Sequence, residues 1–334
     1  MHILDFEKPI AELEGKIEEL RHLSDSGDVN IADEVSKLQA KVDKLLRSTY
    51  AKLTPWQKTQ VARHPERPHA LAYIAALIQD FTPLAGDRAF AEDQAIVGGL
   101  GRFRGRSVMV IGHEKGHDTE SRIKHNFGMA KPEGYRKAQR LFKLAERHGI
   151  PVLTFVDTPG AYPGVAAEEG GQARAIAETM LRMARLTVPV VATVIGEGGS
   201  GGALALAVAD RVLMQENATY SVITPEGCAA ILWRDAAFAP QAAEALKPTA
   251  SELLELGAIE RVVAEPRGGA HHNAETAAAN VGEAITETLA ELDAIPPRER
   301  RRMRRERFRQ LGRWADPDMP PGTMSLFGGG AAGR

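Results

Sequence analysis

Residues 189–202 read Pro-Val-Val-Ala-Thr-Val-Ile-Gly-Glu-Gly-Gly-Ser-Gly-Gly, an apolar run that passes directly into a glycine-rich loop. The run is apolar throughout instead of alternating with polar residues, which is typical of a strand covered on both faces. The Ala-rich residues 200–209 that follow predict a helix. A strand, a loop and a helix in this order favour an α/β fold whose strands are joined by helical crossovers.

The same order recurs earlier in the chain. A second glycine-containing loop, Asp157-Thr158-Pro159-Gly160-Ala161-Tyr162-Pro163-Gly164, follows the apolar run at 151–156. We predict two further strands at 107–111 and 211–214, and helices at 133–148 and roughly 169–186. Ligands of such sheets bind beyond the carboxyl ends of the strands, which is where both loops are expected to lie.

The ends of the chain predict helical appendages. Apolar residues spaced three and four apart within residues 1–50 predict two amphipathic helices, joined as a hairpin by the turn-forming residues 24–28. After the core we predict a short helix at 249–256, a strand at 259–263 and a long helix at about 274–292. Pro296-Pro297 is expected to end the folded body. The predicted domains are therefore a hairpin at 1–50, a main domain at 51–295, and an Arg-rich helix with a flexible Gly/Pro-rich tail at 296–334.

Composition excludes several classes of protein. With 334 residues, 43% of them hydrophobic, the chain can bury a full core. Its net charge of −2 gives no overall field for nucleic acid or anionic membrane. Its one cysteine, Cys228, excludes a disulfide framework and a zinc ribbon built from this chain. We expect a cytoplasmic protein without a membrane span, and we predict no metal site because no histidine spacing supplies a ligand set.

The two loops predict an oxyanion site. Glycines between a strand and a helix let backbone N–H groups approach a ligand, and donors from both loops can converge on one oxygen. Three other motifs were tested on the second loop. Gly196-x-Gly198-x-x-Gly201 is a weak match to the dinucleotide fingerprint, and no Lys-Ser or Lys-Thr follows to make a phosphate-binding Walker loop. Residues 198–202 do match a nucleophile elbow, so a Ser200 hydrolase with Asp210 and His271 or His272 stays an alternative.

Several longer motifs carry a resemblance to a known family. They are the two loops, residues 220–228 (Tyr-Ser-Val-Ile-Thr-Pro-Glu-Gly-Cys), 4–13, 84–88, 111–113, 126–129 and 268–271. Together they resemble the alpha subunit of bacterial acetyl-CoA carboxylase carboxyltransferase over roughly the first 295 residues. The Arg-rich end and the tail match less well, so nothing is carried over to them.

The resemblance implies a crotonase-like (ClpP/crotonase) α/β fold of repeated β-β-α units. It also implies transfer of a carboxyl group from carboxybiotin, carried by the biotin carboxyl carrier protein and not bound covalently here, to acetyl-CoA, which gives malonyl-CoA for fatty acid synthesis. By position, Gly201 and Gly202 match the glycines that bind the biotin oxyanion, and the Gly160-Ala161 peptide is inferred to offer the opposing donor. Gly198, Gly199, Ser200 and Tyr162 are expected around the bound biotin.

The partners implied are a zinc-ribbon beta subunit, commonly in an α2β2 heterotetramer, the carrier protein and a biotin carboxylase. Near alternatives are another acyl-CoA substrate such as propionyl-CoA, or a scaffold or RNA-binding regulator that uses the Arg-rich end. For single side chains we expect Ser200 to cap the following helix, and Glu197 and Glu226 to be structural. The basic stretch from His113 to His125 is expected either to face solvent or to contact CoA phosphates or the carrier.

Overall fold

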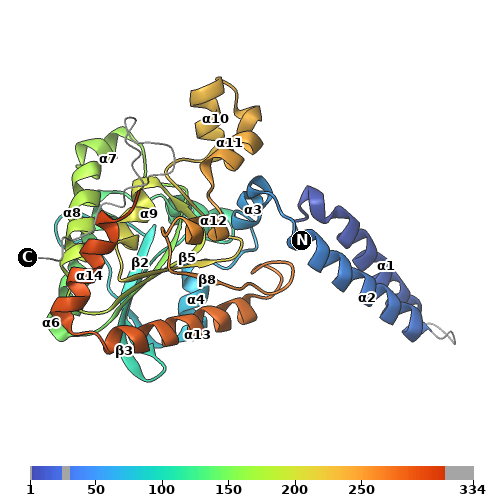
Figure 1. Cartoon of the computed structure of the whole chain (residues 1–334), viewed down its shortest axis with the longest axis horizontal. Coiled ribbons are helices and arrows are strands. Elements are labelled where there is room, and N and C mark those ends of the chain that lie inside the picture. The colour runs from blue at the N-terminus through green and yellow to red at the C-terminus, as the bar shows by residue number, and fades with distance from the viewer. Residues whose placement is uncertain (1, 25–30, 313–334) are drawn as a thin grey trace, which may run out of the picture.

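The computed structural model describes residues 2–24 and 31–312, and its centre is a mixed β-sheet (Figure 1). Within the described residues the strand order is β1-β2-β3-β4-β5-β6-β8, with β7 beside β5. The strands from β3 to β8 along this path are parallel, and they are β3 (Arg106–His113), β4 (Val152–Thr158), β5 (Val190–Gly199), β6 (Arg211–Gln215) and β8 (Arg261–Val263). The five strands predicted from apolar runs are all present.

Three strands were missed. β1 (Ile78–Pro83) and β2 (Ile96–Phe103) extend the sheet in antiparallel fashion beside β3, and the short β7 (Thr219–Ser221) pairs with the end of β5. β1 is mostly exposed, and β2 contains three glycines, so neither has the continuous apolar run that identified the others. β1 and β2 therefore form an antiparallel edge beside the parallel strands from β3 to β8.

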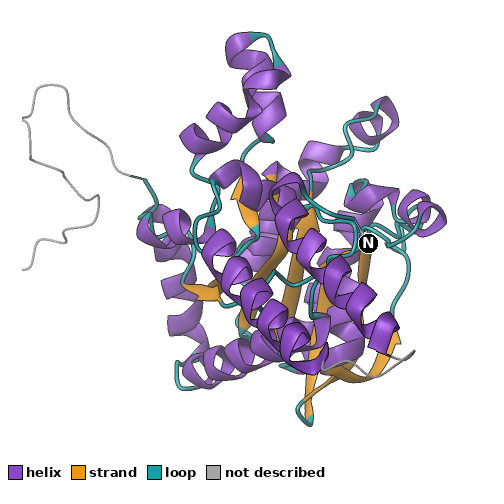
Figure 2. Ribbon diagram, turned by 90° about the vertical axis from the view of Figure 1, so that its right-hand side faces the viewer, coloured by secondary structure: helices purple, strands orange, loops and turns teal. Residues whose placement is uncertain are grey.

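Helices cover both faces of the sheet (Figure 2). Side chains of β3 alternate between the two sides: Met109 and Ile111 join one apolar cluster, Val108 and Val110 the other. The first cluster lies under α6 (Pro132–His148), α8 (Gln172–Arg185) and α9 (Ser200–Ala207), and the second under α4 (Ala70–Leu77) and α13 (Ala274–Asp293). The chain therefore forms a three-layer α/β body, as the covered strands predicted.

The smaller helices surround the carboxyl ends of the strands and the sides of the body. They are α3 (Pro55–Ala62), α5 (Thr119–Lys124), α7 (Val165–Glu169), α10 (Pro225–Trp233), α11 (Ala239–Leu246), α12 (Ala250–Glu255), and the 3-10 turns η1 (Asp5–Glu7), η2 (Asn126–Gly128) and η3 (Ala236–Phe238). α10 and α11 pack against each other and project from the body (Figure 1).

Two N-terminal helices, α1 (Lys8–Ser24) and α2 (Ile31–Tyr50), extend away from the sheet (Figure 1). They pack through the apolar positions that the sequence identified, and Ile10, Ile17, Val42 and Leu46 are buried between them. The reversal predicted at 24–28 lies almost wholly outside the described residues. The domain boundary at 50 stays a prediction.

The expectation that Pro296-Pro297 ends the folded body is wrong. α14 (Pro297–Arg309) packs back against α8, and Arg300 and Arg304 are buried. Two members of the arginine run therefore serve the core of this chain and are not free to bind an acidic partner. The tail beyond Gly312 lies outside the described residues.

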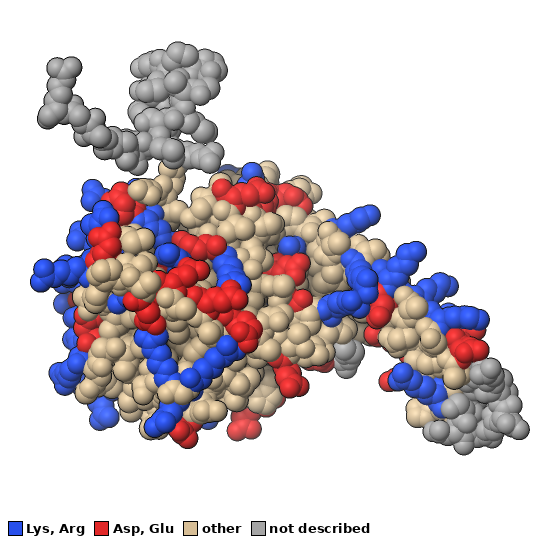
Figure 3. All heavy atoms as spheres, turned by 60° about the horizontal axis from the view of Figure 1, so that its bottom comes forward, with Lys and Arg blue, Asp and Glu red and all other residues tan. Residues whose placement is uncertain are grey.

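The surface carries both signs of charge. On the face in Figure 3, Lys and Arg side chains are interspersed with Asp and Glu over the body, in keeping with the net charge of −2. No helix in the described part of the chain is long and apolar enough to cross a membrane.

Candidate functional site

The two glycine-rich loops leave the sheet side by side. β4 and β5 are parallel neighbours, and Thr158 pairs with Gly198, so the loop at 157–164 begins next to the loop at 196–202. A side chain on Gly199 would overlap the Pro159 carbonyl group, which only glycine avoids. The prediction that both loops lie together at the carboxyl edge of the sheet is confirmed.

Gly202 lies directly against the Gly160-Ala161 peptide. A Cβ atom on Gly202 would be 2.8 Å from the Ala161 nitrogen and 2.9 Å from the Gly160 carbonyl carbon. Gly201, in contrast, has room beside it, since its Cβ would meet only Ile176 at 3.7 Å. The structure therefore brings the four residues of the predicted oxyanion site into one place.

Two kinds of amide donor are available there. Gly201 and Gly202 lie in the first turn of α9, where N–H groups have no acceptor within the helix. In the other loop, the Gly160 N–H donates to Thr158 Oγ1 at 3.1 Å, whereas the Ala161 N–H has no acceptor within residues 31–312. Ala161 is thus the better candidate for the opposing donor.

The other predicted residues line these loops. Gly198 lies under the ring of Tyr220, and Tyr162 is held by its backbone N–H, which donates to the Ala130 carbonyl at 3.0 Å. The expectation that Ser200 caps a helix is wrong. Ser200 is the first residue of α9, its φ is +51°, and its side chain makes no capping hydrogen bond. A positive φ is unusual for serine, and it marks the strained turn from β5 into α9.

An apolar pocket opens beside Gly201. Its lining includes Leu204 of α9, Tyr220 of β7, Val222 just after β7, Leu253 of α12 and Phe308 of α14. Burial raises the pKa of Tyr220 to about 12, so its hydroxyl stays neutral at physiological pH. Gly201 therefore borders an apolar surface, next to which hydrogen bonds to a developing negative charge are stronger than in water.

The parts of a Ser200 hydrolase are not brought together. Asp210 is occupied by Arg304, whose Nη2 lies 2.6 Å from Asp210 Oδ2. His271 Nε2 lies 3.6 Å from Glu7 Oε1, and the ring of His272 lies beside that of His271. Asp210 is therefore paired with Arg304, and His271 and His272 lie beside Glu7 and His64, so the three groups do not form a catalytic triad.

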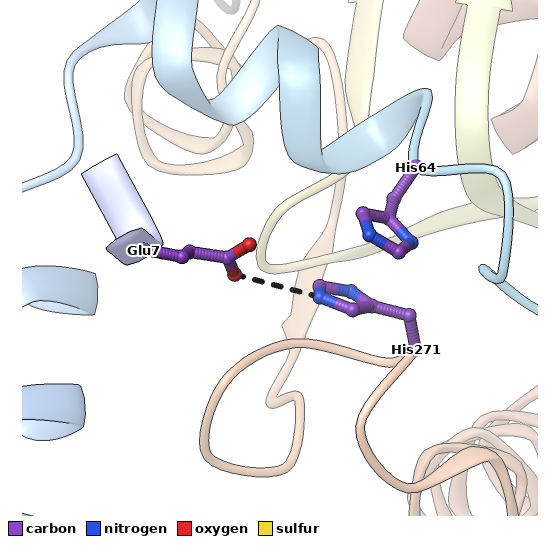
Figure 4. Close-up of side chains that lie close together, drawn as sticks. All are labelled: Glu7, His64 and His271. Carbon is purple, nitrogen blue, oxygen red and sulfur yellow. Dashed lines mark ion pairs between the residues drawn. The ribbon is translucent and has the colours of Figure 1, made fainter. Parts of the chain in front are cut away.

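A cluster of Glu7, His64 and His271 was not anticipated from the sequence. Figure 4 shows Glu7 pointing toward His271, with His64 beside it. Their ligand atoms lie within 4.8 Å of one another, but the two imidazole rings are stacked, with centroids 3.9 Å apart. Both nitrogens of His64 already contact backbone groups, those of His2 and Glu66. Stacked rings cannot aim their lone pairs at one ion, so the cluster fits docking of the N-terminal hairpin better than metal binding. The prediction of no metal in this chain stays a prediction.

The basic stretch at 113–125 faces solvent only in part, through His117 and Lys124. His113 and His125 are buried, and the Lys115 side chain is only 13% exposed and pairs with carboxylates, whereas His117 does face solvent. Sequence reasoning did not assign Lys115 or Asp157 to the site. The only available signal was their position directly after predicted strands.

Known proteins resemble this chain over nearly its whole length. Residues 3–312 match the family described as acetyl co-enzyme A carboxylase carboxyltransferase-like. The acetyl-coenzyme A carboxylase carboxyl transferase subunit alpha of Paramagnetospirillum magneticum is 68% identical over 313 residues, which cover 94% of this chain and 99% of that protein. The subunit of the same name from Rhodospirillum centenum is 69% identical over 312 residues, which cover 93% and 98%.

Solved structures share the fold. A transcarboxylase 12S structure with methylmalonyl-coenzyme A bound superposes with a TM-score of 0.56 at 21% identity, covering 71% of this chain and 44% of that chain. The beta subunit of P. aeruginosa geranyl-CoA carboxylase gives 0.54 at 17% identity, covering 74% and 46%. This chain thus spans less than half of either solved chain. The likeness confirms the predicted crotonase-like α/β fold.

Proposed function

Because this chain belongs to the acetyl co-enzyme A carboxylase carboxyltransferase-like family, we propose that it is the alpha subunit of such an enzyme. In this proposal it acts with a beta subunit to move a carboxyl group from carboxybiotin to acetyl-CoA, giving malonyl-CoA for fatty acid synthesis. Carboxybiotin is a substrate carried by a separate protein, and this chain supplies the place where it reacts.

The observation that carries the proposal is the contact between Gly202 and the Ala161 amide. When the carboxyl group leaves N1 of biotin, negative charge develops on the ureido oxygen. In this proposal the amides of Gly202 and Ala161, with Gly201 beside them, donate to that oxygen from the two loops. Preorganised donors of this kind stabilise a developing oxyanion strongly, so the chain needs neither a nucleophile nor a metal for this step.

The surroundings of the donors suit a biotin ring. The apolar pocket beside Gly201, with Leu204 and Phe308 in its wall, offers a surface for the apolar ring system. Gly198, Gly199, Ser200 and Tyr162 are proposed to shape the two ends of this surface, mainly through their backbone. The loops are rich in glycine and poor in reactive side chains, which agrees with a reaction that proceeds through oxyanions.

Partner chains are part of the proposal. The relatives are named as alpha subunits, which implies a multisubunit carboxylase. We propose a zinc-ribbon beta subunit in an α2β2 assembly, with the biotin carboxyl carrier protein and a biotin carboxylase completing the complex in the cytoplasm. Ile231, Leu232 and Trp233 of α10 are exposed apolar residues on a projecting element, which suits contact with another chain. Another acyl-CoA, such as propionyl-CoA, remains the second candidate substrate.

Reconstitution tests the proposal. Carboxyl transfer from malonyl-CoA to free biotin is measured with this chain alone, with a candidate zinc-containing beta subunit alone, and with the two mixed. We expect turnover only in the mixture, because the acyl-CoA and biotin sites then face each other. No turnover in a complex whose formation has been verified, with either malonyl-CoA or methylmalonyl-CoA as donor, would overturn it.

A further inference from the structure

One lysine, whose side chain is 13% exposed, links the two glycine-rich loops. Lys115 Nζ lies 2.7 Å from Asp157 Oδ1 and 2.7 Å from Glu197 Oε2. Asp157 begins the first loop, and Glu197 lies in the second, one residue before Gly198. A single ammonium group therefore ties together the points at which the two loops leave the sheet.

Further polar and charged groups surround this link. Asp157 Oδ1 also accepts the backbone N–H of Glu197 at 3.0 Å, and its Oδ2 lies 2.7 Å from His69 Nδ1. On the other side, Arg63 Nε lies 2.6 Å from Glu197 Oε1, and the same guanidinium pairs with Glu226 at the start of α10. Cations and carboxylates alternate through the group, so each buried charge has a partner of opposite sign.

Two glycines make room for the lysine link. A side chain on Gly196 would overlap the Asp157 carboxylate, and a Cβ on Gly128 would be 2.8 Å from Lys115 Cγ. Gly128 also has a φ of +77°, which disfavours any other residue. The contacts therefore show that these two glycines accommodate Lys115 and Asp157.

The charges of the link are stable near neutral pH. Burial lowers the pKa of Lys115, but the attraction of Asp157 and Glu197 outweighs burial and raises it. Burial raises the pKa of Asp157, but the effects of Lys115 and His69 outweigh burial and lower it below its ordinary value. His113, which ends β3, is fully buried, and burial lowers its pKa to about 4, so it is neutral at pH 7. Lys115 is thus the cation that the two loop carboxylates share.

We propose that Lys115 is a positioning residue for carboxyl transfer, which holds Asp157 and Glu197 together and so sets the spacing between the Ala161 and Gly202 amides. This inference rests on the proposed function. Oxyanion donors work only within about 2.7–3.1 Å of the oxygen. A displacement of about 1 Å remote from the chemistry can cost on the order of 100-fold in rate. Loosening this link therefore affects the transition state while leaving the binding surfaces in place.

The test is Lys115→Met in the reconstituted complex. We expect kcat to fall by about 10- to 100-fold, with KM for both substrates within about threefold, because ground-state contacts are kept while the donors lose their alignment. Lys115→Met also leaves two buried carboxylates without their shared cation, which lowers the melting temperature. The double variant Lys115→Met/Glu197→Gln removes one charge of each sign. It is expected to recover much of the melting temperature but not kcat.

Arg304→Met is the matched control. Arg304 is a buried cation that binds the Val188 carbonyl and Asp210, at the opposite end of β5 from the loops. The Arg304→Met variant should be less stable than wild type, while its kcat stays within about threefold of the wild-type value.

Three results would overturn the inference. They are wild-type kcat in folded Lys115→Met, full recovery of kcat in the double variant, or an equal loss of kcat in Arg304→Met. If the single variant does not fold, the double variant decides. A wild-type complex without transfer activity would instead refute the proposed function, so the two failures are told apart.

Discussion

Arg304 forms a buried ion pair with Asp210, in which Nη2 and Oδ2 are 2.6 Å apart. The same guanidinium donates to the carbonyl groups of Met183, Leu186 and Val188. Asp210 in turn accepts the Val190 N–H at the start of β5. α14 is therefore locked onto the end of α8 and the beginning of β5, so the arginine-rich segment belongs to the folded body.

Arg304→Met should lower the free energy of unfolding by about 3–5 kcal/mol, because removing one partner leaves Asp210 buried and unpaired. The control is Arg302→Met on the same helix. Arg302 pairs with Glu299 at the surface, where solvent screens the two charges, so Arg302→Met should change the stability little. Urea denaturation of the two variants measures both values. Equal, small losses would show that Arg304 does not anchor α14.

Glu7→Gln should show a pH-dependent loss of stability. The pKa of Glu7 falls to about 2, because His271, Tyr50 and the Leu4 N–H outweigh the effect of burial. A lowered folded-state pKa means that ionised Glu7 stabilises the protein above its unfolded pKa of 4.5, and that this stabilisation is lost as the pH falls toward 2. The difference in unfolding free energy between wild type and Glu7→Gln should therefore be largest above pH 5 and shrink below pH 4. The exposed Glu19→Gln is the control, and a difference independent of pH would contradict this role.

Ser200 should not react with serine-directed phosphonates. Asp210 and His271 are engaged by Arg304 and Glu7, so no base activates the hydroxyl. Intact-mass measurement after incubation with a fluorophosphonate is expected to show an unmodified chain. Stoichiometric labelling that disappears in Ser200→Ala would revive the hydrolase alternative.

Much of the sheet could be predicted from the sequence because β4 and β5 are buried on both faces and are therefore apolar throughout. β2 could not be predicted, because its glycines are required by close contacts with other elements that the sequence does not reveal. A Cβ on Gly98 would overlap Leu141 of α6, and one on Gly99 would overlap the Thr82 carbonyl group of β1. α14 was predicted as a helix, but the burial of Arg304 depends on Asp210, which lies 94 positions earlier.

The candidate site was predictable only in part. Gly202 and Ala161 could be found because they lie in loops that follow predicted strands, and parallel strands place such loops at one edge. The sequence could not assign three further residues to the site, namely Lys115, His69 and Arg63. They reach the loops from separate segments, and no regular spacing between them marks a motif. The site roles of the glycine-loop residues stay predictions until variants are measured.

Gly202→Val tests whether the Gly202 and Ala161 amides together bind the oxyanion. A Cβ there would be 2.8 Å from the Ala161 nitrogen, so a larger side chain forces the loops apart. Transfer from malonyl-CoA to free biotin should fall by about 100- to 1000-fold in the complex with a beta subunit, while circular dichroism and complex formation stay as in wild type. Gly15→Ala, on the exposed side of α1 with no atom within 4 Å, should transfer normally. A folded Gly202→Val complex with wild-type turnover would show that the Gly202 and Ala161 amides do not bind the oxyanion together.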